Sequence, residues 1–503
     1  MNNHCNNSDM IRDGFLWTSL ILLTSLLYSC TTPPPEAYGP VPSERQLRWQ
    51  ETEMYTIVHF TPTTFQDKEW GFGDADPTIF NPTDFSADSM VMAIKAGGFK
   101  GITFVAKHHD GFCLWPTATT AYNISKTPFR DGKGDMVKEM MEATHKAGLG
   151  FGIYCSPWDR NSAFYGTPKY VSDVYYPQLS ELYRNYGPLF TVFFDGANGG
   201  DGYYGGANEA RKINASEYYK FDTIWSMVRR MQPDAAIFSD IGPDIRWVGN
   251  EKGEAAPTSW ATLTPVSPEP GKAPAPGFTT DADLPGGMRD GKYWIPAECD
   301  VPLRPGWFYH TDQDDKVKTP QQLLDIYYKS VGRGASLDLG IAPMPNGRLH
   351  QNDITSLKRF GEILRKTFAV NYAHNAEVTA TNTRGKSKEF SPKQLIDDDR
   401  YSYWATDDKV TTPEVTLTWK EPVTFNVIRL RENIKLGQRI EEVVVDVWDS
   451  GTWKQIAQAT SIGGNRLIRL PEDVTTTQLR IRIVKSPVCV ALSDLGVFKE
   501  GER

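Results

Sequence analysis

The sequence is poor in several features that define whole classes of protein. It has six cysteines in 503 residues, too few for a disulfide scaffold, so we expect Cys113, Cys155, Cys299 and Cys489 to be buried free thiols. It has no basic excess: the net charge of −8 argues against a nucleic acid as partner. It also lacks a glycine-rich phosphate-binding motif after its first predicted strand, which argues against a dinucleotide-binding fold.

What is abundant is apolar and aromatic material. The chain is 40% hydrophobic and 12% aromatic, with 14 Trp, 22 Tyr and 24 Phe. This composition excludes a disordered or collagen-like protein, and the length fits two to four domains.

One apolar run stands near the amino terminus, over residues 15–28. It is too short to span a bilayer and is typical of a signal-peptide core. Ser29 and Cys30 follow it and resemble a bacterial lipobox, in which Cys30 would be lipidated; an ordinary cleaved signal and a buried apolar helix are the alternatives. We therefore expect a signal peptide over 1–30, a proline-rich tether over 31–44, and an exported periplasmic or outer-membrane lipoprotein that meets the membrane only through this anchor.

The next part of the chain alternates short apolar strands with amphipathic helices. The predicted strands cover residues 54–60, 101–106, 150–154, 190–194, 235–239 and 336–341, and the predicted helices 84–96, 135–147, 173–186, 217–231, 320–331 and 353–367. Such strand–helix units form a parallel sheet, and their number favours a (β/α)8 barrel over residues 45–372. Residues 199–206 and 264–285 are predicted as long surface loops.

After residue 372 the pattern changes to short runs rich in β-branched residues. Runs over 414–419, 424–431, 442–448, 467–470 and 478–484 predict an antiparallel β-sandwich over 373–503. The segment 395–406 resembles the start of discoidin-like, galactose-binding sandwiches. This domain could bind sugar, with Trp404 or nearby loop residues in contact with glycan, or only support the barrel. Asp397, Asp398 and Asp399 could hold a structural Ca²⁺ or form an exposed acidic turn.

Polar or aromatic side chains stand where successive predicted barrel strands end. His59 ends the first strand, His108 and His109 follow the second, Tyr154 ends the third, and Asp195 follows the fourth. Chemistry in such barrels takes place at the carboxyl ends of the strands. The pattern therefore predicts an active site.

Asp195 is the candidate nucleophile, because it follows four apolar residues and would stand at the barrel mouth; a turn-capping aspartate is the alternative. A carboxylate in this position suits nucleophilic attack at the anomeric carbon of a sugar, as in the two-carboxylate scheme of glycosidases. That scheme needs a second carboxyl group, with a raised pKa, as the acid. Glu251, Glu254 and Glu298 are candidates, and Trp247 near Glu251 favours that residue slightly.

The adjacent His108 and His109 could also suggest a metal site. Neighbours on a strand point to opposite sides, so one ion is not expected to use both. We expect no metal and no cofactor, and instead imidazoles that hydrogen-bond sugar hydroxyls.

Together these motifs resemble family-29 glycoside hydrolases, the α-L-fucosidases. The resemblance rests on His59-Phe60, Glu69-Trp70-Gly71, the block from Lys107 to Phe112 with Trp115, and Phe193 to Gly196. It implies a retaining exo-hydrolase with Asp195 as nucleophile, acting on fucosylated glycans. The implied fucose-binding residues are His59, Glu69, Trp70, His108, His109, Trp115, Tyr154 and Trp307.

The segment from Trp247 to Glu251 resembles the branch of this family that is selective for α-1,3/1,4 linkages. It implies Glu251 as the acid/base, with Glu254 as the fallback because the 199–219 loop lengthens the interval from Asp195. A glycosidase of another specificity, such as an α-galactosidase, and a non-catalytic glycan-binding lipoprotein are the alternative functions.

Overall fold

The computed structural model describes residues 32–501, so the predicted signal peptide and Cys30 lie outside the described residues. Eight parallel strands close into a barrel in the order β1, β12, β11, β8, β7, β4, β3, β2. Their bounds are β1 Met54–Val58, β2 Gly101–Lys107, β3 Gly150–Cys155, β4 Thr191–Phe193, β7 Ala236–Ser239, β8 Ile245–Trp247, β11 Ala297–Pro302 and β12 Ser336–Ile341. The predicted barrel is confirmed.

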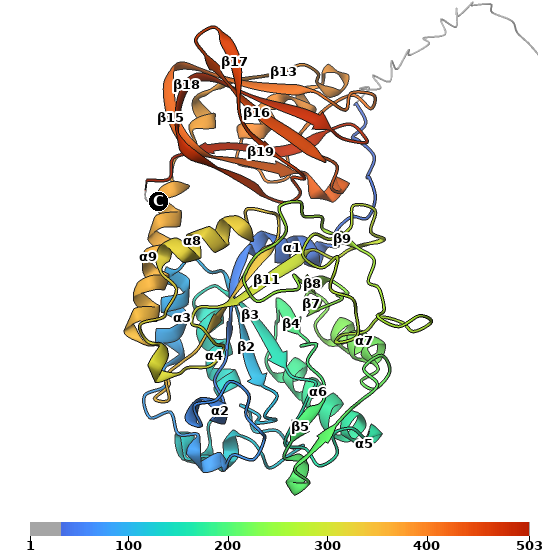
Figure 1. Cartoon of the computed structure of the whole chain (residues 1–503), viewed down its shortest axis with the longest axis vertical. Coiled ribbons are helices and arrows are strands. Elements are labelled where there is room, and N and C mark those ends of the chain that lie inside the picture. Colours follow the sequence, from blue (N-terminus) through green and yellow to red (C-terminus); the bar gives the residue numbers. More distant parts are fainter. Residues whose placement is uncertain (1–31, 502–503) are drawn as a thin grey trace, which may run out of the picture. The chain divides into compact units, whose positions relative to one another are not determined.

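Helices lie outside the barrel strands, as α3, α4 and α9 show in Figure 1. The α-helices are α1 Glu44–Thr52, α2 Pro62–Phe65, α3 Ala87–Ala96, α4 Met136–Lys146, α5 Pro168–Tyr170, α6 Tyr176–Asn185, α7 Phe221–Met231, α8 Pro320–Lys329 and α9 Gln351–Thr367. Helix α3 illustrates the local signals: the Ser86 side chain accepts a hydrogen bond from the Ser89 amide, and the helix ends at Gly97. Its buried face carries Met90 and Ile94, four residues apart.

Two barrel strands were not predicted, because they lack an apolar pattern. Strand β8 is only Ile245–Trp247, and β11 carries the buried acids Glu298 and Asp300. The connection from β7 to β8 is five residues long and holds no helix. The regular alternation of strand and helix therefore fails in this part of the barrel.

Two smaller predictions also need correction. Helix α7 begins at Phe221 rather than at residue 217, because Lys220 adopts a left-handed conformation with φ 54°. Part of the predicted loop at 199–206 pairs as a two-stranded sheet, β5 Gly200–Gly202 with β6 Glu209–Arg211. A second such pair, β9 Thr262–Leu263 and β10 Tyr293–Trp294, flanks the 264–285 loop.

The carboxyl-terminal domain is an antiparallel sheet structure, as predicted. Its strands are β13 Glu377–Ala380, β14 Trp404–Ala405, β15 Glu414–Glu432, β16 Glu442–Asp449, β17 Thr452–Ala459, β18 Arg466–Lys485 and β19 Ala491–Phe498. Strands β15 and β18 each merge two predicted runs, because the turns expected between them are bulges in continuous strands.

The residues proposed for sugar or calcium in this domain are engaged locally. Trp404 is fully buried and its Nε1 donates to the carbonyl of Asn382, so a glycan contact through Trp404 is ruled out. The Asp397 carboxylate accepts from the Ser402 hydroxyl, and Asp399 accepts from the Tyr401 amide. Within residues 32–501 no group of three His, Cys, Asp or Glu side chains is placed to hold a metal ion.

Ion pairs join the barrel part and the sandwich part of the chain. The Glu53 carboxylate, just before β1, accepts from Arg431 at 2.8 Å and from Arg400 at 3.2 Å. Burial raises the pKa of Glu53, but the two guanidinium groups outweigh it and bring the pKa to about 2. These contacts fit the supporting role of the sandwich.

The predicted free thiols are confirmed: Cys113, Cys155, Cys299 and Cys489 are buried and unpaired. In the described range, 32–501, the helices are all too short or too polar to cross a membrane.

Candidate active site

A cavity of about 340 Å³ opens at the carboxyl ends of the barrel strands. The predicted residues that line it are His59, Glu69, Trp70, His108, His109, Tyr154, Asp195, Glu251 and Trp307. They come from segments far apart in the sequence, and the parallel strands bring them to one face of the barrel. The cavity has the size of a small-molecule site.

Asp195 follows β4, and its side chain is 30% exposed. The Tyr154 hydroxyl donates to Asp195 Oδ2 at 2.9 Å, and the Ala197 amide donates to Oδ1 at 2.7 Å. These two hydrogen bonds fix the orientation of a carboxylate that a ligand in the cavity can reach.

Glu251 lies in the segment after β8, and its side chain is exposed. Desolvation raises the pKa of Glu251; a hydrogen bond with the Trp307 side chain lowers it, and the negative charges of Asp195 and Glu69 raise it. The net shift is upward. A general acid must carry a proton, and the upward shift in the pKa of Glu251 favours its protonated form.

The other two candidate acids lie elsewhere. Glu254 is absent from the cavity wall, and its carboxylate accepts from Lys329 Nζ at 2.6 Å. Glu298 is fully buried in β11 and accepts from the Tyr55 hydroxyl. The geometry therefore favours Glu251.

The three cavity histidines are buried and close together. The ring centroids of His108 and His109 lie 4.1 Å apart, and those of His59 and His108 lie 5.3 Å apart. Burial lowers the pKa of all three, and the pKa of His59 falls to about 3. They are neutral imidazoles near pH 7, able to accept or donate hydrogen bonds to an uncharged ligand.

Glu69 holds the segment that carries Trp307. Its carboxylate accepts from the backbone amides of Trp307 at 2.9 Å and Phe308 at 3.3 Å. His310 Nε2 lies 2.8 Å from Glu69 Oε1, while its Nδ1 lies 2.6 Å from Asp67. Trp70 is 51% exposed and meets the His109 ring edge-on at 5.2 Å.

Among the predicted sugar-binding residues, Trp115 is the one that does not line the cavity. Its side chain is 1% exposed and belongs to the hydrophobic core of the barrel part. Its indole Nε1 donates to Glu181 Oε2 at 2.8 Å. Trp115 therefore packs behind the site, and the prediction of a substrate contact is corrected on this geometry.

Two acidic cavity residues were missed, although the strand that carries one of them, β12, was predicted. Asp300 on β11 and Asp338 on β12 are register partners, and both line the cavity. Burial raises the pKa of each well above its usual value. One signal in the sequence could have revealed this acidic part of the cavity. Glu298 and Asp300 are two residues apart in one strand, so their side chains share one face of it.

A second cavity of about 360 Å³ shares Asp195, Glu251 and Asp300 with the first. Its other wall includes Trp247 and, from the 264–285 loop, Thr279 and Asp281. Asp240 anchors this loop, because its Oδ2 accepts from the Gly277 amide at 2.9 Å. Burial raises the pKa of Asp240 to about 7. Asp195 and Glu251, the candidate nucleophile and acid, thus face both cavities.

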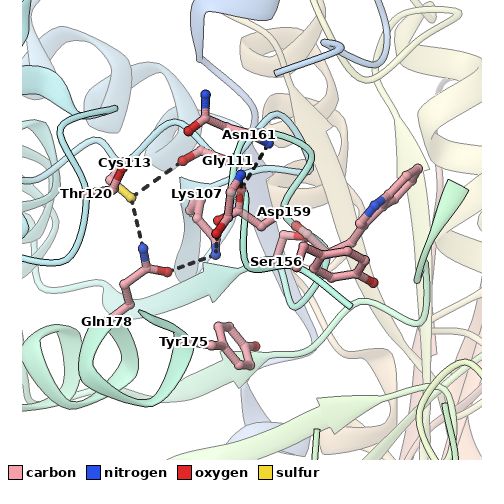
Figure 2. A network of polar contacts seen from close by, with 12 residues as sticks. Lys107, Gly111, Cys113, Thr120, Ser156, Asp159, Asn161, Tyr175 and Gln178 are labelled. Carbon is pink, nitrogen blue, oxygen red and sulfur yellow. Dashed lines mark hydrogen bonds and ion pairs between the residues drawn. The ribbon is translucent and has the colours of Figure 1, made fainter. Parts of the chain in front are cut away.

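A buried ion pair joins Lys107, the residue before His108, to Asp159; Figure 2 shows the two residues with their neighbours. Lys107 Nζ lies 3.4 Å from Asp159 Oδ2 and donates to Gln178 Oε1 at 2.8 Å and to the Tyr170 hydroxyl at 3.0 Å. Asp159 also accepts from the amide of Asn161. The network ties the segment after β2 to the segment after β3.

We expect Lys107→Met to lower the free energy of unfolding by about 3–5 kcal/mol, because it leaves the Asp159 charge buried without its partner. Lys138→Met is the matched control, since its pair with Glu142 is exposed and 4.0 Å long and is worth about 0.5 kcal/mol or less. Urea denaturation followed by tryptophan fluorescence would compare the two. Equal losses would contradict a structural role for the buried pair.

The fold and the cavity define the class of protein. At the carboxyl ends of its strands, a closed (β/α) barrel presents the carboxyl groups of Asp195 and Glu251 together with neutral imidazoles and the exposed Trp70. This combination of groups is typical of a glycoside hydrolase.

Comparison with known proteins narrows this class. The family model "Alpha-L-fucosidase" matches residues 39–367, and the model "F5/8 type C domain" matches residues 377–493. The chain is 37% identical to "Alpha-L-fucosidase 1" of Arabidopsis thaliana over 97% of its own length and 93% of that protein. The chain therefore belongs to the α-L-fucosidase family, glycoside hydrolase family 29, and is an α-L-fucosidase by activity.

Solved structures of α-L-fucosidases are similar to this chain along most of its length. A crystal structure of a putative α-L-fucosidase from Bacteroides thetaiotaomicron superposes with a TM-score of 0.83 at 33% identity, covering 93% of this chain and 99% of that one. A family-29 fucosidase from Ruminococcus gnavus in complex with fucose gives 0.81 at 29% identity, covering 94% and 97%. Family membership decides for the fucosidase hypothesis over a different glycosidase and over a silent glycan-binding protein.

Proposed function

We propose that the protein removes terminal α-L-fucose from glycans with retention of configuration. The observation that carries this proposal is the pair of carboxyl groups that shares one cavity: an oriented carboxylate, Asp195, and an acid with a raised pKa, Glu251. Asp195 attacks the anomeric carbon while Glu251 protonates the departing oxygen. Glu251 then removes a proton from the water that releases fucose.

The remaining cavity residues bind the sugar. Fucose carries no charge, so neutral His59, His108 and His109 suit its hydroxyl groups, and the exposed ring of Trp70 offers an apolar face. The Ruminococcus gnavus relative, whose structure holds fucose, supports a fucose ligand in this fold.

The second cavity is the space for the leaving group. It begins at Asp195 and Glu251, so a glycan whose fucose fills the first cavity extends into the second. This shape and the segment from Trp247 to Glu251 support a preference for α-1,3 or α-1,4 linkages on a branched glycan. We propose further that the enzyme is exported and anchored through Cys30.

The stereochemical outcome tests the proposal directly. With an aryl α-L-fucoside as substrate, the first fucose released is expected to be the α anomer, because two displacements at one carbon restore its configuration. Proton NMR of the anomeric signals in the first minutes of the reaction, before mutarotation, distinguishes the two products. Initial β-fucose would contradict a covalent intermediate.

A further inference from the structure

The buried serine Ser156 lies behind a cavity histidine and carries no role in the scheme above. It follows β3, is fully buried, and its Oγ lies 2.7 Å from His109 Nδ1. Figure 2 shows Ser156 beside the network of Lys107 and Asp159. What this hydroxyl does depends on where its one hydrogen goes.

The backbone decides the direction of the serine hydrogen. Ser156 Oγ lies 2.8 Å from the carbonyl oxygen of Trp158, and a carbonyl can only accept. Ser156 therefore donates to Trp158. It has no second hydrogen for His109, so the short contact to Nδ1 requires the hydrogen to sit on the imidazole.

The other side of the imidazole agrees with this assignment. His109 Nε2 lies 3.6 Å from Asp195 Oδ2, too far for a hydrogen bond. That carboxylate oxygen already accepts from the Tyr154 hydroxyl. Because burial lowers the pKa of His109, the ring is neutral. With Nδ1 protonated, Nε2 then carries a lone pair.

We infer that Ser156 is a positioning residue that fixes His109 in the Nδ1–H tautomer, so that Nε2 accepts a hydrogen bond from a hydroxyl of the bound sugar. The opposite tautomer would direct an N–H at Asp195 and compete with the sugar for its carboxylate. With the Nδ1–H tautomer, the Asp195 carboxylate accepts hydrogen bonds only from Tyr154 and Ala197, and His109 Nε2 is left for the substrate.

The surrounding backbone holds the two partners in place. The Ser156 amide donates to the Lys107 carbonyl, and the Arg160 amide donates to the His109 carbonyl, each at 2.9 Å. The segments that carry His109 and Ser156 are therefore bonded to each other on both sides of the contact. Such a frame allows one hydroxyl to set the tautomer without movement of the ring.

The tautomer can be measured without substrate, by ¹⁵N NMR of full-length enzyme labelled at histidine. The His109 signals are identified by their absence from His109→Gln. We expect a hydrogen on Nδ1 and none on Nε2. A hydrogen on Nε2, or on both nitrogens, would overturn the inference.

Variants then test the serine. In Ser156→Ala we expect His109 to be no longer held in the Nδ1–H tautomer, and kcat/KM on an aryl fucoside to fall about tenfold, the effect of one lost hydrogen bond. Ser156→Thr keeps the hydroxyl and should keep both the tautomer and the wild-type kcat/KM. Ser330→Ala is the matched control, because Ser330 is also a buried serine that donates to a backbone carbonyl, at 2.8 Å. An unchanged tautomer or an unchanged kcat/KM in Ser156→Ala would overturn the inference.

The inference rests on the proposed function only where it assigns Nε2 to a sugar hydroxyl. If Asp195 were not the nucleophile, Asp195→Ala would keep its activity, while the NMR result in the free enzyme would stand.

Discussion

Asp195→Ala is expected to lower kcat on an aryl α-L-fucoside by about 10⁴-fold or more, because it removes the carboxylate that we propose forms the covalent intermediate. Asp195→Asn should have a similar effect, since an amide keeps the shape but does not attack. Azide should restore turnover to the alanine variant by taking the place of the missing side chain and yielding a fucosyl azide. Steady-state kinetics with and without azide, and product analysis, measure both effects.

The control for this loss is Asp222→Ala, which removes an exposed carboxylate from the first turn of α7. It should leave kcat unchanged, and circular dichroism should show that all three variants are folded. Hydrolysis by both Asp195 variants at the wild-type rate would remove Asp195 from the mechanism.

Glu251→Ala is expected to lower kcat/KM by about 10²–10⁴-fold on a natural fucosyl linkage, the usual contribution of a general acid. The loss should be much smaller on an aryl fucoside, because a good leaving group departs without a proton. Glu254→Ala is the matched control, since Glu254 pairs with Lys329 away from the cavity. The ratio of the two substrates' kcat/KM values in each variant is the measurement.

The pH profile gives the same residue a second signature. Glu251 must be protonated for the first step, so kcat/KM should fall as pH rises through its pKa, which lies above the ordinary glutamate value. In Glu251→Gln this alkaline fall should disappear. If Glu254→Ala instead showed the substrate-dependent loss, the acid/base would be Glu254.

Much of the barrel could be predicted because buried parallel strands are apolar along their whole length. The sequence pattern predicts strand β2, whose seven residues are all buried, and helix α3, which begins after a serine cap. It does not predict strand β11, because Glu298 and Asp300 interrupt it. Burial raises the pKa of each acid well above its usual value, which favours the uncharged form inside the barrel; no local pattern shows that.

The site could be predicted to the extent that its residues lie at or just after strand ends, because parallel geometry brings those ends together. His59 and His108 directly follow β1 and β2, Tyr154 is the last residue but one of β3, and Asp195 is the second residue after β4. Trp115 misled because it stands seven residues after His108, in a segment that turns back into the core. Glu69 and Trp307 were found through the family resemblance alone, since the hydrogen bonds that join them connect residues 238 positions apart.

The most direct test of the account is to trap the enzyme with a slow fluorinated fucose analogue and map the adduct by mass spectrometry. We predict one fucosyl group, bound through an ester to the peptide that contains Asp195. An adduct on any other peptide, or none under conditions where the analogue inactivates the enzyme, would contradict a covalent mechanism at this carboxylate.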